Sequence, residues 1–596
     1  MKRIAIIAAV VIAVLAVAIA AMPFVVPGDF LNQRVAARLS ALTGRPVTLT
    51  GEPSLSIYPY FAITVGGLSI GDSEESDRGP LLVAETLNAR VRLWTLLIGR
   101  IEFEEFELVK PVLRLVVGTE GKANWDFSES AVARQAAAPP PPAANSTVPP
   151  APPPDLRLGR LHVVDGSIVY DDVRSNTREE LTAVDLDLLW PTASAAVNGH
   201  GKMLWRGEAV EFTALLAQPL ELARGGASPA RFAFASTPLR ASFSGKASGS
   251  NAFLLEGEAN VQTPSLRRVI EWMGIPMGTG PILGAGSISG SASLAVGSIG
   301  FSRAAIELDG NAAEGSVSVQ LGGPRPVIKG ALTSRSLDIS AYLEAIRADL
   351  SAEGSWLIAP ARLDFAEAID ADLSLSADAI VAGSARIGRT IATAGIQNGA
   401  LNFVLQETRF HEGAVTLRMT ADVHEETLTV NAAAKVADIL ALDALTDLAG
   451  VTGLVGQASL GFDLAASGRT WADVLRSITA IGSVIMANGS VRGFDMARVA
   501  ESFADPLARP VEAGSTETAF YRLTVNFAVR DGALGTEDLV MVGNGVRVSL
   551  IGDASLFTGA VEARARVTTA AGTVPVTISG SLRAPVIAPQ KSPAAP

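Results

Sequence analysis

The sequence predicts a mainly β protein that begins with one transmembrane helix and carries a few short capping helices. Three observations predict this fold. Residues 4–22 contain no charged or strongly polar side chain. Farther along the chain, apolar and polar residues alternate in many short segments, the pattern of strands with one apolar face. The chain also contains 56 glycines, which fit tight turns between such strands.

The N-terminal apolar segment is the first predicted element. Lys2 and Arg3 precede it, and residues 24–26 extend it past Pro23. At ~1.5 Å per residue, this helix crosses most of a ~30 Å hydrocarbon core, and its basic start places the N-terminus in the cytoplasm. A cleaved signal peptide is the alternative, since residues 18–20 read Ala-Ile-Ala. The apolar run exceeds the usual ~7–15 residues of a signal peptide, so we expect an uncleaved membrane anchor at 1–26 and an exported body.

Composition narrows the classes of function. The net charge is −12 and no cluster of Lys or Arg is longer than two, which argues against nucleic-acid binding. The absence of cysteine excludes disulfides and thiolate metal sites. Charged residues are 18% of the chain, below the usual ~25%, and the mean hydropathy is +0.33. This balance predicts an apolar groove or cavity, with a large buried core as the alternative.

Helix signals and one proline-rich stretch divide the chain. Asp29 caps a predicted helix that ends at Gly44, and residues 136–154 hold nine prolines without a charge. Shorter helices are expected after Thr263-Pro264, Thr470 and Asp495. We therefore expect six segments: an anchor (1–26), an N-terminal unit of helix and strands (27–135), a proline-rich linker or insert (136–154), a β-rich middle region (155–360), a C-terminal β region (361–585) and a tail (586–596).

The clearest predicted strand lies near the C-terminus. Its apolar residues alternate with polar or small ones: Tyr521, Leu523, Val525, Phe527 and Val529. Asp531-Gly532 then supplies a tight turn. Similar Asx-Gly pairs occur at 165–166, 398–399 and 488–489, either as ordinary hairpin turns or as a loose internal repeat of a β meander.

Catalytic and metal-binding signals are weak. The four histidines, at positions 162, 200, 411 and 424, form no metal-binding motif, and His411-Glu412 and His424-Glu425-Glu426 lie near predicted hairpin ends. Residues 383–390 resemble a phosphate loop but carry Arg389 where Lys is required. Asp370 and Asp372 fit a solvated strand face, and the glutamates at 102–107 fit a charged sheet edge. We expect no catalytic residue, no metal and no cofactor.

The order of several short segments resembles the AsmA family of bacterial envelope proteins, a group similar to bridge-like lipid-transfer proteins. The resemblance covers residues 1–175 well and 360–560 moderately, and it is diffuse between 200 and 360. It is carried by LTGRPV (42–47), LSIYP (55–59), LSIGD (68–72), LLVAE (81–85), GKANW (121–125), LGRL (158–161), DGSIVYD (165–171) and NGSVRGFD (488–495).

The resemblance implies a protein anchored in the bacterial inner membrane, with a periplasmic body. It further implies an elongated, curved antiparallel β-sheet that forms an apolar groove. It also implies phospholipid as the ligand and a role in lipid movement and outer-membrane assembly. On this interpretation Tyr521, Leu523, Val525, Phe527 and Val529 are candidate lipid-facing residues. The alternative is a non-catalytic assembly factor that binds other envelope proteins, since an apolar strand face fits a protein core as well as a lipid.

Overall fold

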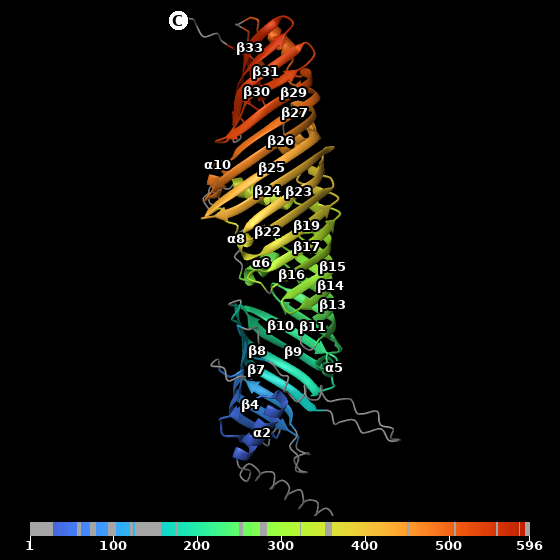
Figure 1. Cartoon of the computed structure of the whole chain (residues 1–596), viewed down its shortest axis with the longest axis vertical. Helices are drawn as coiled ribbons and strands as arrows, with labels where there is room; N and C mark the ends of the chain where they lie inside the picture. The colour runs from blue at the N-terminus through green and yellow to red at the C-terminus, as the bar shows by residue number, and fades with distance from the viewer. Residues whose placement is uncertain are drawn as a thin grey trace, which may run out of the picture. The chain divides into compact units, whose positions relative to one another are not determined.

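The computed structural model describes residues 28–56, 61–71, 79–92, 103–119, 123–125, 156–174, 177–249, 254–274, 283–321, 323–351, 360–449, 452–505, 508–555, 558–582 and 584–590. The chain divides into two compact units. Unit 1 comprises Met1–Trp272 with Ser287–Ser302, and unit 2 comprises Met273–Gly286 with Arg303–Pro596. Both units are mainly β with short helices, which confirms the predicted class (Figure 1).

Unit 1 is a sheet whose neighbouring strands are mostly antiparallel. Parallel pairing occurs where β7 lies beside β5 and β6. The elements are α2 (Gly28–Thr43), β1 (Val47–Leu49), β2 (Ser54–Ser56), β3 (Ala62–Ile70), β4 (Leu82–Val91), β5 (Phe103–Val109), β6 (Val112–Val117), β7 (Arg157–Asp172), β8 (Thr177–Thr192), β9 (Val197–Trp205), β10 (Glu208–Leu216), α5 (Pro219–Ala223), β11 (Ala227–Ser236), β12 (Arg240–Ser248), β13 (Leu254–Thr263), α6 (Leu266–Trp272) and β14 (Gly286–Ala295). β15 (Ser298–Leu308) begins in unit 1 and ends in unit 2.

Unit 2 continues the meander pattern, with one parallel pair, β17–β19, in its main sheet. Its elements are β16 (Asn311–Gln320), β17 (Val327–Ser334), β18 (Leu337–Asp338), α7 (Ser340–Ser351), α8 (Asp364–Ala368), β19 (Asp370–Ala377), β20 (Ile380–Ala382), β21 (Ala385–Ile387), β22 (Thr390–Gln397), β23 (Ala400–Phe410), β24 (Gly413–His424), β25 (Thr427–Leu440), α9 (Ala441–Ala449), β26 (Leu454–Gly468), α10 (Trp471–Arg476), β27 (Thr479–Arg492), α11 (Met496–Ser502), β28 (Val511–Glu512), β29 (Glu517–Arg530), β30 (Ala533–Val542), β31 (Val546–Ser555), β32 (Val561–Thr569), β33 (Gly572–Ser581) and β34 (Ala584–Pro589). The last strand extends into the segment predicted as the tail.

The Asx-Gly pairs have two structural roles. Asn398-Gly399 and Asp531-Gly532 are two-residue hairpin turns in which both residues have positive φ, as predicted. Asp165-Gly166 lies instead inside β7, where the register with β8 shifts. Asn488-Gly489 lies inside β27, beside the register shift with β26. The repeated dipeptide therefore marks both turns and bulges. In both settings its Asx residue has φ near 50°, a conformation that Asp and Asn adopt more readily than most residues.

The predicted helices are present. α2 ends at Gly44, which has φ 72° and donates its N–H to the Ser40 carbonyl. Thr470 and Asp473 form a capping box at α10. Asp495 accepts the Arg498 N–H at the start of α11. The structure adds four short helices that the sequence reading missed: α5, α7, α8 and α9.

Two predicted segments lie outside the described residues, and one predicted feature is wrong. The expected anchor at 1–26 and the proline-rich stretch at 136–154 lie outside the described residues. Within the part that is described, no helix is both long and apolar enough for a membrane span. The glutamates of β5 are predicted to lie at a charged sheet edge. This prediction is wrong, because β5 pairs with β4 on one side and with β7 on the other.

Candidate functional site

One face of the unit 2 sheet is apolar across ten consecutive neighbouring strands. Two adjacent rows of register partners contain only glycine, alanine and larger apolar residues, and every Leu, Met and Phe in them is half-buried. The first row is Gly315, Leu332, Leu375, Ala392, Leu405, Leu417, Ala434, Phe462, Gly482 and Phe527; the second is Val317, Gly330, Leu373, Ala394, Phe403, Met419, Ala432, Leu464, Ala480 and Val529. We call these two rows the apolar strip. The rows lie ~7 Å apart, two residues along each strand.

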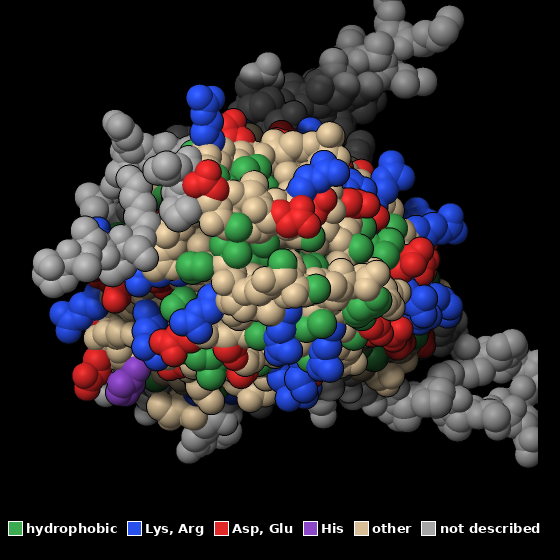
Figure 2. Space-filling view, turned by 90° about the horizontal axis from the view of Figure 1, so that it is seen from above, with side chains coloured by type: hydrophobic (Ala, Val, Ile, Leu, Met, Phe, Trp, Pro, Cys, Tyr) green, Lys and Arg blue, Asp and Glu red, His purple; other side chains and the backbone are tan. Residues whose placement is uncertain are grey.

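The opposite face of the same strands is polar. A row shifted by one residue from the apolar strip reads Ser318, Lys329, Asp372, Gly395, Asn402, Thr420, Asn431, Ala465 and Thr479. Figure 2, which looks down the long axis of Figure 1 and not onto this face, shows Lys, Arg, Asp and Glu side chains around small hydrophobic patches. The alternation therefore separates a water-facing surface from an apolar one along the whole series of strands.

Helices cover both margins of the apolar strip. On one side, Met486 and Leu523 form a buried cluster with residues of α9 and α11. On the other side, Ala421 and Leu428 pack with Val474 of α10. α8 and α10 lie at one end of the strands (Figure 1). The margins are thus closed by protein, whereas the Leu, Met and Phe side chains of the strip between them are only half-buried.

The C-terminal end of the strip is closed by α11. Met496 and Val499 of this helix are buried in the cluster that also includes Val567 of β32. Thr518 fixes the start of the helix, because its buried hydroxyl accepts the Met496 N–H at 2.8 Å and donates to the Phe494 carbonyl at 2.7 Å. The apolar face therefore becomes a closed core at this end of unit 2.

Unit 1 has the same two-faced construction. Its apolar rows are Ile63, Ala89, Phe106, Leu161, Leu188, Gly199, Ala214, Phe232, Phe243 and Ala259, and Val65, Leu87, Leu108, Val163, Leu186, Gly201, Phe212, Phe234, Ala241 and Val261. On β3 to β5 these residues are buried in a cluster with Val35 of α2. On β7 to β11 the larger side chains are half-buried. Farther along, Trp272 of α6 packs on Trp205 and Phe234, with ring centroids 4.7 and 6.3 Å apart.

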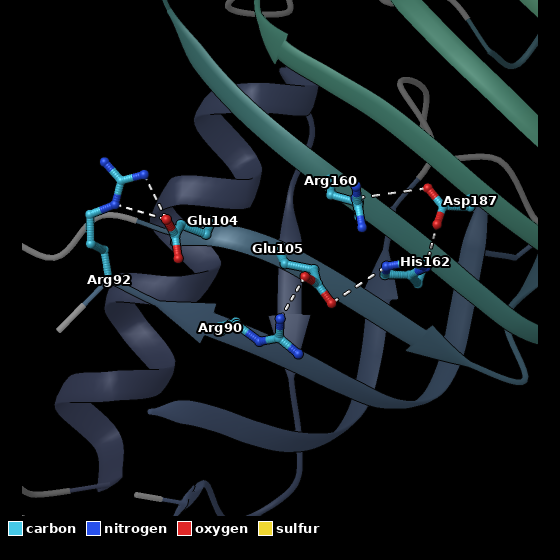
Figure 3. Close-up of polar contacts among 7 residues, drawn as sticks. All are labelled: Arg90, Arg92, Glu104, Glu105, Arg160, His162 and Asp187. Carbon is cyan, nitrogen blue, oxygen red and sulfur yellow. Dashed lines mark hydrogen bonds and ion pairs between the residues drawn. The ribbon is translucent and has the colours of Figure 1, made fainter. Parts of the chain in front are cut away.

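The other face of unit 1 carries cross-strand ion pairs, with α2 lying behind the sheet in this view (Figure 3). Glu105 Oε2 lies 2.9 Å from Arg90 Nη1, and Glu105 Oε1 lies 3.5 Å from His162 Nε2. His162 Nδ1 lies 3.3 Å from Asp187 Oδ2, and Arg160 also approaches Asp187. These contacts join β4, β5, β7 and β8. Glu105 of β5 therefore has a structural role, because it pairs with side chains of both neighbouring strands.

Carboxylates near this face titrate below their usual range. The hydrogen bond from Arg206 is the main cause of the lowered pKa of Glu179, with a smaller contribution from the Trp205 indole. The backbone N–H of Asp165 is the main cause of the lowered pKa of Asp185. Both effects stabilise the charged carboxylate through donors on neighbouring strands, so they fit structural roles.

The predicted lipid-facing residues of β29 occupy different environments. Tyr521 is 60% exposed, whereas Leu523 and Val529 are 8% and 6% exposed, and Val525 and Phe527 are half-buried. Phe520 is 3% exposed, so the alternation changes phase between residues 520 and 523. Leu523 and Val525 belong to the side that α11 covers. Phe527 and Val529 lie in the apolar strip.

The weaker chemical signals are explained by turns and pairings. His411-Glu412 and Glu425-Glu426 are the two-residue turns of successive hairpins, with positive φ at all four residues. Nε2 of His411 lies 2.8 Å from Asp447 Oδ2 of α9. Residues 383–390 form a β-hairpin turn and strand rather than a loop before a long helix. Across the described ranges, no three His, Asp or Glu side chains are grouped closely enough to bind a metal.

A sequence model of the AsmA family matches residues 1–268. This part of the chain is therefore similar to AsmA-family proteins. The match confirms the N-terminal part of the resemblance and extends it to the first turn of α6, close to the point where the first stretch of unit 1 ends. No curated protein and no solved structure matches the chain. The family match ends before unit 2 begins, so the interpretation of unit 2 rests on its apolar strip.

Proposed function

We propose that this AsmA-family protein is anchored in the inner membrane by residues 1–26 and binds phospholipid acyl chains along its apolar faces in the periplasm. Through these faces it conducts lipid and supports outer-membrane assembly and lipid homeostasis. The observation that carries the proposal is the apolar strip of unit 2, whose Leu, Met and Phe side chains are only half-buried between two helix-covered margins.

The physical reason is the cost of leaving this surface in water. Removing apolar area from water yields ~25 cal/mol per Å², or ~0.8 kcal/mol for each buried methylene. An acyl chain that lies on the strip takes its own apolar surface out of water, together with the apolar surface of side chains such as Phe403, Met419 and Leu464. Such contacts need no directional partner, which suits a ligand that slides from strand to strand.

Neighbouring residues of β26 give a matched test. Leu464 faces the apolar strip, and Ala465 is exposed on the opposite face. Full-length protein is purified from membranes, and its phospholipid is extracted and quantified by mass spectrometry. We expect the parent and Ala465→Glu to carry equal amounts of lipid, and Leu464→Glu to lose most of its lipid, because an acyl chain that covers the new carboxylate removes its hydration.

Hydrogen exchange of β26 checks that both variants are folded. Equal lipid in folded Leu464→Glu and in the parent contradicts binding on the strip. Lipid-free parent protein favours the envelope assembly factor instead.

A further inference from the structure

The polar face of unit 2 has an apolar and acidic area near its C-terminal end. Four large hydrophobic residues are exposed on the strands β27, β29 and β31: Ile481 (62%), Ile485 (47%), Tyr521 (60%) and Ile551 (51%). The isoleucines lie one residue out of phase with the buried or half-buried residues of the apolar face, so this area is separate from the apolar strip. Exposed hydrophobic residues gathered on an otherwise polar face are typical of interaction surfaces.

A hollow of about 1190 Å³ includes Ile551 of these four residues in its lining. It spans β29 to β33, where the register shifts between Thr524 and Ala528 and again between Thr536 and Leu539. Such irregularities bend strands locally. Ile551 is part of the lining, so apolar contact is available inside the hollow.

The hollow carries more negative than positive charge. Four carboxylates line it, Glu537, Asp538, Asp553 and Glu562, against two guanidinium groups, Arg530 and Arg564. Asp538 is held by the amide of Asn526. Asp553 and Glu562 are direct register partners on adjacent strands, and both are exposed. Like charges placed directly opposite one another destabilise a sheet, so a cation bound here relieves a repulsion that is built into the fold.

We propose that this hollow, with Ile551 and the Asp553–Glu562 pair at its centre, docks a cationic amphipathic segment of another protein. Lysine or arginine side chains of the partner meet the carboxylates, and its apolar side chains cover Ile551. The negative excess disfavours anionic lipid on this face. Phe527 of the apolar strip also borders the hollow, but the acidic residues of the hollow lie outside the strip, and the inference does not depend on the proposed lipid site.

The test uses full-length protein and two labelled synthetic peptides. Leu and Lys alternate in the first peptide, and Leu and Glu alternate in the second. Fluorescence anisotropy should show binding of the cationic peptide only, and affinity should fall with added salt. Asp553→Asn combined with Glu562→Gln should weaken binding about tenfold, and Ile551→Ser should weaken it several-fold.

The matched control neutralises two exposed carboxylates elsewhere in unit 2, Asp372→Asn with Glu407→Gln, and should bind like the parent. Removing the Asp553–Glu562 repulsion should leave the thermal midpoint no lower than the parent's. Equal binding of both peptides, no binding of either, or equal weakening in the control overturns the proposal. Should the double variant misfold, Ile551→Ser against the parent still decides the location, since unchanged binding excludes the hollow.

Discussion

Two alanine substitutions on neighbouring strands, one in each variant protein, distinguish a closed core from an open surface by the stability that each one loses. Met486 of β27 is 1% exposed and packs in the cluster with α11. Met486→Ala should cost ~2–5 kcal/mol, because it leaves an enclosed cavity. Leu464 of β26 is half-buried in the apolar strip. Burying a whole leucine contributes ~1.5–3 kcal/mol, and no closed cavity forms on an open face, so Leu464→Ala should cost only about 1 kcal/mol.

The assay is native-state hydrogen exchange of the full-length protein, after removal of bound lipid, at the amides of β26 and β27. It reports the local free energy of opening, so it does not require the whole chain to unfold in one step. The informative quantity is the loss of opening free energy in Leu464→Ala relative to that in Met486→Ala. The two losses can be compared directly because β26 and β27 are hydrogen-bonded neighbours. If Leu464→Ala costs as much as Met486→Ala, the strip is a closed core and the reasoning for a groove is wrong.

Three further predictions concern turns and titrating groups. Replacing the turn Glu425-Glu426 by Asn-Gly should raise the free energy of unfolding by about 1 kcal/mol, because both glutamates have positive φ; a lower thermal midpoint would contradict this. The pKa of Glu179 is lowered from 4.5, mainly by Arg206, so its stabilising effect is present at neutral pH and is lost as the pH falls below that value. Glu179→Gln should therefore lower the thermal midpoint at pH 7 and not in strong acid, and an equal loss at both would refute the assignment. Burial, followed by a hydrogen bond to Asp309, raises the pKa of Tyr342 from 10.0 to about 12. The stability that Tyr342 contributes is therefore present below pH 10 and is lost as the pH rises toward 12. Over this range the protection of α7 amides, relative to their intrinsic exchange rates, should fall in the parent and not in Tyr342→Phe, and an equal fall in both would contradict this.

Local signals predicted much of the fold. The N-caps of α10 and α11 and the Asn398-Gly399 and Asp531-Gly532 turns are set by neighbouring residues, so they were recognisable in the sequence. Asp165-Gly166 and Asn488-Gly489 have the same composition but became bulges. The outcome there depends on the register of the partner strand, which no local pattern contains.

The candidate site was only partly predictable for the same reason. Alternation along β29 indicated one apolar face, but a change of phase placed Phe520 in the core and Tyr521 in solvent. Whether a helix covers an apolar row depends on long-range packing, which separates Val525 beside α11 from Phe527 in the apolar strip. The parallel pairing of β17 with β19 likewise follows from a crossover that strand patterns alone do not reveal.

The central claim is that acyl chains lie on the apolar strip, and site-specific photocrosslinking tests it most directly. A photoreactive amino acid replaces Leu464 or its neighbour Ala465 in the full-length protein, and the second pair is Met419 and Thr420 of β24. After irradiation in cells, mass spectrometry should find phospholipid attached at 464 and 419 and not at 465 or 420. Crosslinks to protein alone at 464 and 419, or lipid attached equally on both faces, would contradict the account.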